Sequence, residues 1–280
     1  MNGNNKPIHW YPGHMAVATR EIEKHLKIVD MIIELIDARA PISSRHPFLA
    51  NYSGAKSHLI VMSKTDLADP RVTSRWEIYF KERKLPLVTV DLQSRLSAPI
   101  IVSRALEISR GVIERQIAKG MKPQPIRAMV IGIPNVGKST LINLLAHKSA
   151  AEVSDRPGVT RAPQWIKPNN KLWLLDTPGV LPMNYNLQLT ALHLAAIGSI
   201  RRDILPLEDI SSYLYKYIRT NYPKYLEKYL DANPAPDYQM FLQQVATRFG
   251  LIDDVKKAAI RFYDDFKSGK IGRITLEVAY

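Results

Sequence analysis

GIPNVGKST occupies residues 132 to 140 and fits the pattern G-x-x-x-x-G-K-[ST]. It follows the apolar run IRAMVIGI (126–133), which predicts a buried strand, and it opens a stretch with helical spacing. Gly132 and Gly137 let the main chain wrap closely, so that its N–H groups point inward at phosphate oxygens. An ordinary glycine-rich turn is the alternative, and the strand and helix on either side disfavour it. The stretch therefore predicts a phosphate-binding loop.

The residues of this loop have separate predicted roles. Lys138 would neutralise the β- and γ-phosphates of a nucleotide, and Ser139 would bind Mg²⁺ through its hydroxyl. The N-terminus of the following helix would add its dipole. The loop residues expected to bind the nucleotide are Pro134, Asn135, Val136, Gly137, Lys138, Ser139 and Thr140.

A second motif, LLDTPGV (174–180), lies about 40 residues downstream at the end of another apolar run. There the carboxylate of Asp176 can reach the same Mg²⁺ through water, and Gly179 can offer its N–H to the γ-phosphate. Thr160, between the two motifs, can bind Mg²⁺ while the γ-phosphate is present and release it afterwards. A simple turn threonine is the alternative at that position.

The stretch MSKTDL (62–67) predicts the base site. Asp66 can accept hydrogen bonds from the N1–H and N2–H₂ edge of guanine, and Lys64 can lie along the base. The stretch resembles the N-K-x-D signature of GTPases, with Ser63 in place of Asn. We expect the change to weaken one polar contact by about 0.5–1.5 kcal/mol, roughly 2- to 10-fold in affinity, and GTP to remain preferred over ATP.

The order of these motifs is unusual, because the base signature precedes the phosphate loop, which precedes D-T-P-G. This order indicates a circularly permuted GTPase domain. Short apolar runs separated by helical patterns predict a mostly parallel sheet with helices on both faces. The less apolar run at 161–168 carries prolines and predicts an edge strand. The predicted central strands lie at 28–38, 58–64, 85–91, 126–133 and 171–177.

The pattern changes after about residue 185, where helical spacing replaces apolar runs. We therefore expect two domains, an α/β GTPase domain over 1–185 and a small all-α domain over 186–280. Because the second follows the D-T-P-G loop directly, hydrolysis could move it as a lever. Its expected helices lie at 207–223, 222–230, 238–250 and 255–269, and two more are expected in the first domain at 17–28 and 101–120.

Charge and composition limit the classes of partner and of binding site that the chain can have. The 280 residues carry 39 Lys+Arg against 26 Asp+Glu, a net charge of +13 that favours nucleic acid or an acidic membrane surface. Basic and aromatic residues recur at 216–230, 246–250 and 261–273, where they predict RNA contact, the alternative being aromatics that face a core. No cysteine is present, which excludes disulfides and thiolate zinc sites. No apolar run reaches the roughly 18 residues of a membrane span, so we expect a cytoplasmic protein.

The segments HWYPGHM (9–15) and DARAPISSR (37–45), the permuted order and GIPNVGKSTLIN together resemble the ribosome biogenesis GTPase A family, in the circularly permuted YlqF/YawG group. The resemblance implies hydrolysis of GTP, with Mg²⁺, and K⁺ bound by Asn135. It further implies binding to a late precursor of the large ribosomal subunit and its RNA, and release after hydrolysis. We expect a monomer.

The resemblance also assigns a role to His14. Small GTPases orient the attacking water with a Gln just after D-x-x-G, and here that position is Val180, which cannot hydrogen-bond water. Family members with an apolar residue there are thought to use the histidine of P-G-H-M, so His14 becomes the expected catalytic residue. A histidine that caps a turn or contacts RNA is the alternative.

Two other functions stay open at this point. One is a permuted GTPase that serves the small subunit or a mitochondrial ribosome, and the absence of a zinc-binding pattern disfavours the relatives that carry a zinc knuckle. The other is an RNA-binding scaffold with a vestigial nucleotide site. The intact set Lys138, Ser139, Asp176 and Gly179 disfavours the scaffold.

Overall fold

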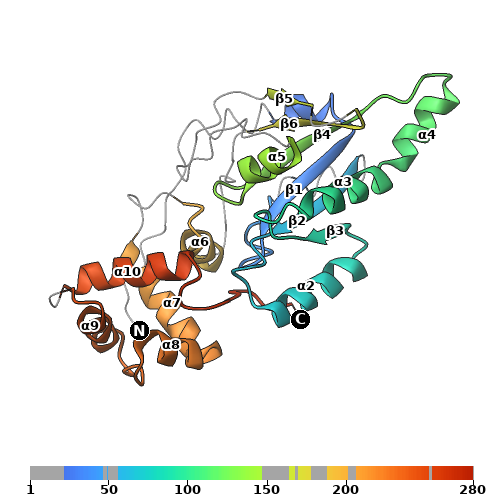
Figure 1. Ribbon diagram of the computed structural model, residues 1–280. Coiled ribbons are helices and arrows are strands. Elements are labelled where there is room, and N and C mark those ends of the chain that lie inside the picture. Colours follow the sequence, from blue (N-terminus) through green and yellow to red (C-terminus); the bar gives the residue numbers. More distant parts are fainter. Residues whose placement is uncertain are drawn as a thin grey trace.

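The computed structural model describes residues 22–46, 49, 56–146, 164–167, 170–177, 188–200, 206–251 and 254–279. Its centre is a six-stranded sheet in the order β3-β2-β1-β4-β6-β5 (Figure 1). All neighbours pair in parallel except β5, which runs antiparallel to β6 at the edge. Each predicted strand is present, including the edge strand: β1 Met31–Asp37, β2 Ser57–Ser63, β3 Leu87–Thr89, β4 Ile126–Gly132, β5 Gln164–Ile166 and β6 Leu172–Asp176.

The sheet has two halves that reflect the motif order. The first three strands of the chain form one half, and β4, β6 and β5 form the other. The halves meet where β1 pairs with β4, Met31 opposite Ala128 and Leu35 opposite Gly132. The strand carrying the base signature and the strand leading into the phosphate loop therefore flank β1.

Helices cover both faces of the sheet, because the strands are apolar on both sides. On one face Ile33 and Val130 pack in one cluster with Ile101 and Leu141 from the helices α3 and α5. On the other face Ile36 packs with Trp76 and Phe80 of α2, and residues 22–26, which are helical, pack over β1 and β4. The helices of this part are α2 Pro70–Glu82, α3 Ser97–Ile108, α4 Arg110–Ala118 and α5 Lys138–Ala146.

Two of these helices differ from the sequence prediction. The helix expected at 101–120 is divided at Ser109, which is buried and donates its hydroxyl to Met31 Sδ at 3.4 Å. Helix α2 was not predicted, although it has clear start signals. Asp69 caps it by accepting from Arg71 N at 2.8 Å, and Pro70 occupies the first turn.

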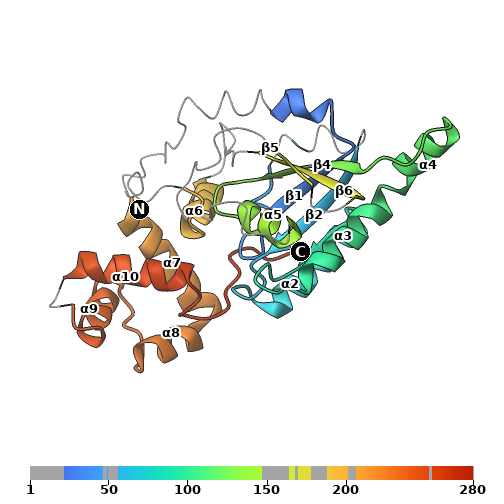
Figure 2. The same ribbon diagram turned by 45° about the horizontal axis from the view of Figure 1, so that its top comes forward.

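The part of the chain after residue 185 is helical in its described residues up to Lys267, as expected. Helices α7 to α10 stand together beside the sheet, and α6 lies between them and the sheet (Figures 1 and 2). Aromatic rings fill their centre, with Tyr215 stacked on Phe241 at 4.5 Å between centroids. The expected boundary at 185–186 lies outside the described residues. The helices are α6 Gln188–Ala196, α7 Leu207–Asn221, α8 Pro223–Leu230, α9 Tyr238–Arg248 and α10 Val255–Lys267.

After α10 the chain returns to the sheet in an irregular segment that the sequence analysis did not predict (Figure 1). We call residues 269–277 the C-terminal tail. Leu276 N donates to Arg39 O at 2.7 Å, and Trp76 Nε1 donates to Glu277 O at 3.0 Å. The tail therefore joins the helical part to the loop that follows β1 and to helix α2. None of the helices in the described part of the chain combines the length and apolarity that a membrane crossing requires.

Candidate functional site

Four parallel strands end at the same edge of the sheet, and their ends bring the predicted site residues together. The strands β1, β2, β4 and β6 end at Asp37, Ser63, Gly132 and Asp176. In open α/β sheets this carboxyl edge is where ligands bind. The base signature and the phosphate loop, about 70 residues apart in sequence, are neighbours here: Ser63 Oγ donates to Val136 O at 2.7 Å.

The phosphate loop has the tight geometry that its glycines allow. Asn135 and Gly137 both have positive φ, 60° and 105°. A Cβ on Gly132 would lie 2.9 Å from Leu35 O, so only glycine fits where the loop leaves β4 beside β1. Lys138 then begins α5 and folds back over the loop, donating to Gly132 O and Ile133 O, each at 3.1 Å. Pro134 and Val136 are buried, and Ser139 and Thr140 are half-buried in the first turn of α5.

Lys138 is buried at the bottom of this loop. Burial lowers the pKa of its ammonium from the ordinary 10.5 to about 8, and the nearby carboxylate of Asp176 opposes the shift. A buried cation whose hydrogen bonds go to neutral carbonyls is poorly compensated. An anionic phosphate at this position would compensate it.

The residues present fit a magnesium ion bound together with a nucleotide. Asp176 ends β6 and is 6% exposed, and the adjacent Thr177 donates its hydroxyl to Val130 O at 2.6 Å, which fixes the end of β6 against β4. Ser139 supplies a hydroxyl at the start of α5. Mg²⁺ usually takes only one or two protein oxygens besides phosphates and water.

The base signature forms a loop after β2. Lys64 has a φ of 57°, and its ammonium donates to Asn135 O at 2.6 Å, so this lysine lies along the phosphate loop. Asp66 is exposed at the turn. Ser63 is fully buried and its hydroxyl lies within hydrogen-bond distance of both Ile36 O, at 3.0 Å, and Val136 O. In this structure Ser63 therefore joins β1 to the phosphate loop.

Sequence reasoning missed a buried ion pair beside these loops. Arg39, 1% exposed, donates from Nη2 to Asp37 Oδ2 at 2.8 Å and from Nε to Asp37 Oδ1 at 3.0 Å. Lys64 Nζ lies 3.4 Å from the same carboxylate. Burial by itself would raise the pKa of Asp37, but Arg39 and Lys64 hold it at about 2. The signal in the sequence was limited to Arg39, two residues after the aspartate that ends β1.

The site also contacts the helical part of the chain. Arg39 donates to Ile197 O, just after α6, at 3.3 Å and to Lys267 O, at the end of α10, at 3.0 Å. Asn135 donates from Nδ2 to Gly198 O at 2.7 Å. The turn after α6 thus receives hydrogen bonds from the phosphate loop and from Arg39. Three predicted site residues, His14, Thr160 and Gly179, lie outside the described residues.

Comparison with known proteins identifies the family. A family model described as "50S ribosome-binding GTPase" matches residues 127–230. Ribosome biogenesis GTPase A of Priestia megaterium is 40% identical over 277 residues, which cover 96% of this chain and 96% of that protein. The Bacillus cereus protein of the same name is 38% identical over 276 residues, covering 96% and 93%. The chain belongs to the ribosome biogenesis GTPase A family.

Solved structures agree on the fold of this GTPase. The GDP-bound structure of YlqF gives a TM-score of 0.67 at 24% identity and covers 92% of this chain and 99% of that one. The GNP-bound YlqF from T. maritima gives 0.66 at 24% identity and covers 94% and 98%. The predicted permuted P-loop GTPase fold with a helical C-terminal part is confirmed, and the family is one of GTP-hydrolysing enzymes.

Proposed function

We propose that this GTPase acts late in assembly of the large ribosomal subunit. In its GTP state it binds the precursor subunit and its RNA, and it leaves after hydrolysis to GDP and phosphate. The observation that carries the proposal is the hydrogen bond from Asn135 in the phosphate loop to Gly198 O after α6. Through it, a rearrangement of the loop around the γ-phosphate reaches the helices. The description of the matching family model, which names the 50S particle, supports the choice of subunit.

The nucleotide would lie across the carboxyl edge of the sheet. Lys138 and the N–H groups of the phosphate loop would hold the β- and γ-phosphates, and Asp66 with Lys64 would hold the base. Ser139 and Asp176 would hold Mg²⁺, which when bound neutralises charge on the phosphates. Gly179 and Thr160 are proposed to complete this site from the segments on either side of β5 and β6.

Two further parts of the catalytic proposal concern His14 and potassium. His14 would orient the attacking water, a task that Val180 cannot perform. Asn135 would bind K⁺ through its amide oxygen, since its amide nitrogen is directed to Gly198. Both parts depend on the family resemblance.

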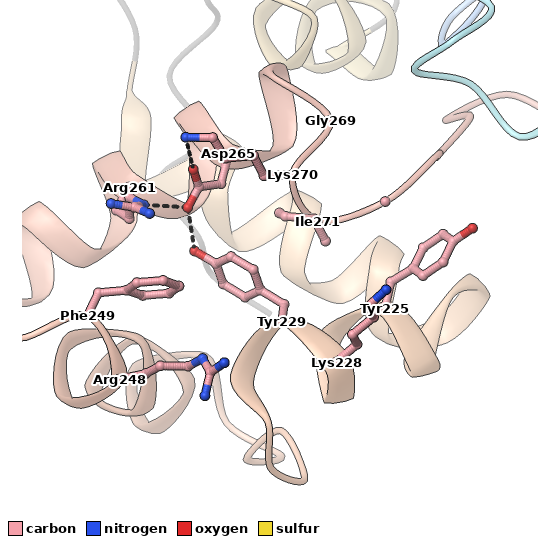
Figure 3. A pocket seen from close by; sticks show the side chains of 11 residues that line it. Tyr225, Lys228, Tyr229, Arg248, Phe249, Arg261, Asp265, Gly269, Lys270 and Ile271 are labelled. Carbon is pink, nitrogen blue, oxygen red and sulfur yellow. Dashed lines mark hydrogen bonds and ion pairs between the residues drawn. The ribbon is translucent and has the colours of Figure 1, made fainter.

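The RNA contact would be made by the helical part, where the three basic and aromatic stretches of the sequence meet. They surround one hollow of about 430 Å³, shown in Figure 3. Four cationic side chains line it against one carboxylate, that of Asp265, which is 2% exposed and accepts from Tyr229 OH at 3.0 Å. This excess positive charge, beside the ring of Phe249, suits a phosphate and a stacked base. The four cations are Lys228, Arg248, Arg261 and Lys270.

We place this activity in the cytoplasm, on a monomer with a GTPase unit over 1–185 and an RNA-binding unit over 186–280. The extra contacts of the C-terminal tail with the first unit imply that the two units respond to each other.

The central test is GTP hydrolysis in potassium buffer, with purified large subunits, with small subunits and alone. We expect slow turnover alone, on the order of 10⁻⁴ s⁻¹, and strong stimulation by large subunits only. Replacing K⁺ by Na⁺ should reduce the rate of GTP hydrolysis. His14→Ala should lower the stimulated rate and leave GTP binding unchanged. Stimulation by small subunits instead, or none by either particle, would contradict the proposed partner.

A second test addresses the hollow. The double variant Lys228→Ala/Arg248→Ala should weaken binding to ribosomal RNA and reduce the salt dependence of that binding by about two phosphate contacts. Lys256→Ala/Lys257→Ala removes two exposed lysines of α10 that lie outside the three stretches and do not line the hollow, and it is the matched control. Equal losses for both variants would point to general charge and away from the hollow.

A further inference from the structure

The loop that carries Asp66 is held from outside by the C-terminal tail. Arg273 donates from Nη2 to Thr65 O at 2.7 Å and from Nε to Ala68 O at 2.9 Å. Ile274 N donates to Leu67 O at 3.0 Å, between those two carbonyls. The tail thus binds the main chain on both sides of Asp66 through partners about 200 residues away in sequence.

The same tail continues to the helix after the loop and to the helical part. Thr275 is fully buried, and its hydroxyl accepts from Asp69 N at 3.0 Å, next to the start of α2. Thr275 O accepts from Tyr217 OH of α7 at 2.8 Å. Close packing adds to these bonds, because a Cβ on Gly269 would lie 2.6 Å from Leu67 Cδ2.

These contacts matter because the loop itself closes around Asp66 with one main-chain hydrogen bond, from Leu67 N to Lys64 O at 3.0 Å, and the tail supplies the others that the described residues show. Asp66 is exposed, and the loop begins with Lys64 in a left-handed conformation. A carboxylate that accepts from two groups on one base edge must be placed within about 0.5 Å to form both bonds well. Hydrogen bonds from a guanidinium to the flanking carbonyls restrict the main chain and so restrict where Asp66 can point.

We propose that the C-terminal tail, chiefly through Arg273, positions Asp66 and thereby sets the affinity and guanine selectivity of the nucleotide site. Arg273 is a positioning residue in this scheme and does not touch the nucleotide. The proposal rests on the proposed role of Asp66 as the base-reading residue. Because Tyr217 ties the tail to α7, a partner bound to the helices would change nucleotide affinity, and the nucleotide would change partner affinity by the same factor.

The test compares GTP with inosine triphosphate, which lacks the N2 amino group that Asp66 would read. Arg273→Ala should raise the Kd for GTP about 3- to 10-fold and raise the Kd for inosine triphosphate, which keeps only the N1–H contact, by a smaller factor, so that the preference for GTP over inosine triphosphate falls. Arg273 is exposed, so the variant should fold, and a thermal melt checks this. Arg83→Ala removes another exposed arginine that donates to a main-chain carbonyl, Tyr79 O at 3.3 Å, at the far end of α2 from the Asp66 loop; it is the matched control and should change neither Kd.

Asp66→Asn separates the two proposals, since it should transfer preference from GTP to xanthosine triphosphate. If it does so while Arg273→Ala keeps the wild-type ratio, the positioning proposal is wrong and the base site stands. A parallel loss of affinity for both nucleotides in Arg273→Ala would likewise overturn positioning. If Asp66→Asn leaves selectivity unchanged, the base assignment fails and the positioning proposal fails with it. Thr275→Val removes the hydroxyl that accepts from Asp69 N, a second contact between the tail and this loop. It should lower the preference for GTP over inosine triphosphate as Arg273→Ala does.

Discussion

Asp37 ends β1, and Lys138 begins α5 after the phosphate loop that follows the neighbouring strand β4; both are buried, and the fold treats their charges in opposite ways. Asp37 is 1% exposed and is surrounded by Arg39 and Lys64, which hold its pKa near 2 despite burial. Lys138 is 8% exposed, and burial lowers the pKa of its ammonium to about 8 because its nearest acceptors are neutral carbonyls. The folded protein therefore stabilises the charged form of Asp37 and destabilises the charged form of Lys138.

The difference separates two parts of the site. We call the buried ion pair of Asp37 with Arg39 and Lys64 the framework, and the phosphate loop with Lys138 the working part. Around Asp37 the charges are complete without a ligand, and Arg39 extends them to the ends of α6 and α10. Around Lys138 the positive charge is compensated fully only when an anionic phosphate binds. Below pH 8 this lysine is charged in both the folded and unfolded protein, so its buried charge costs on the order of 3 kcal/mol of stability. Such a cost is typical of residues kept for function.

The largest expected effect comes from breaking the framework. Arg39→Ala leaves the carboxylate of Asp37 buried with only Lys64 beside it, and it removes the donors to Ile197 O and Lys267 O. Removing one partner of a buried ion pair usually costs about 3–5 kcal/mol. Urea unfolding should show a loss of that size.

Arg127 provides a matched control for this variant. It forms the same two-pronged contact with Asp30, at 3.1 Å for both nitrogens, but its side chain is 45% exposed. Arg127→Ala should cost about 0–1 kcal/mol, as exposed pairs do. If both variants lose the same free energy of unfolding, burial does not strengthen the Asp37–Arg39 pair.

Acid should weaken the framework before it affects the phosphate loop. A carboxylate whose folded pKa is lowered stabilises the protein above its unfolded pKa, and that stability is lost as pH falls through the folded value. For Asp37 the window runs from 3.8 down to about 2 and is worth about 2 kcal/mol. Glu34 acts in the same direction, because His58 and Arg45 lower its pKa against burial. Unfolding free energies measured from pH 5 to pH 2 should fall more steeply in the wild type than in Asp37→Asn, and parallel curves would contradict the assignment.

The two regions also differ in how much of them the sequence revealed. The phosphate loop was predicted residue by residue, because its pattern is contiguous and its strand and helix are adjacent. The role of Arg39 could not be predicted, because two of its acceptors are main-chain carbonyls 158 and 228 residues away. The same holds for Arg273, whose acceptors lie more than 200 residues earlier. Main-chain carbonyls leave no side-chain pattern, so such contacts appear only in the folded chain.

The working part can be tested through the pH dependence of GTP binding. Above about pH 8 Lys138 of the free protein loses its proton, and bound phosphate would require that proton back, so the Kd for GTP should rise up to about tenfold per pH unit. Titrations with a fluorescent GTP analogue between pH 7 and pH 9.5 would measure this. Lys138→Arg keeps its charge throughout and should remove the rise, whatever its absolute affinity. If the Kd for GTP rises equally with pH in both proteins, the titrating group is not Lys138.

The smallest expected effect tests the link between the two regions. Ser63 ends β2 next to Lys64 of the framework, and its hydroxyl reaches Val136 O of the phosphate loop and Ile36 O of β1. Ser63→Ala should remove one net hydrogen bond, about 0.5–1.5 kcal/mol, and weaken GTP binding roughly 2- to 10-fold because the loop is less firmly placed. Ser74→Ala removes a hydroxyl that donates to Pro70 O at 3.0 Å on the exposed surface of α2, and it should change neither stability nor affinity. If Ser63→Ala lowers the melting temperature but leaves the Kd for GTP at the wild-type value, the hydroxyl supports the sheet alone and the phosphate loop holds its shape without help from β2.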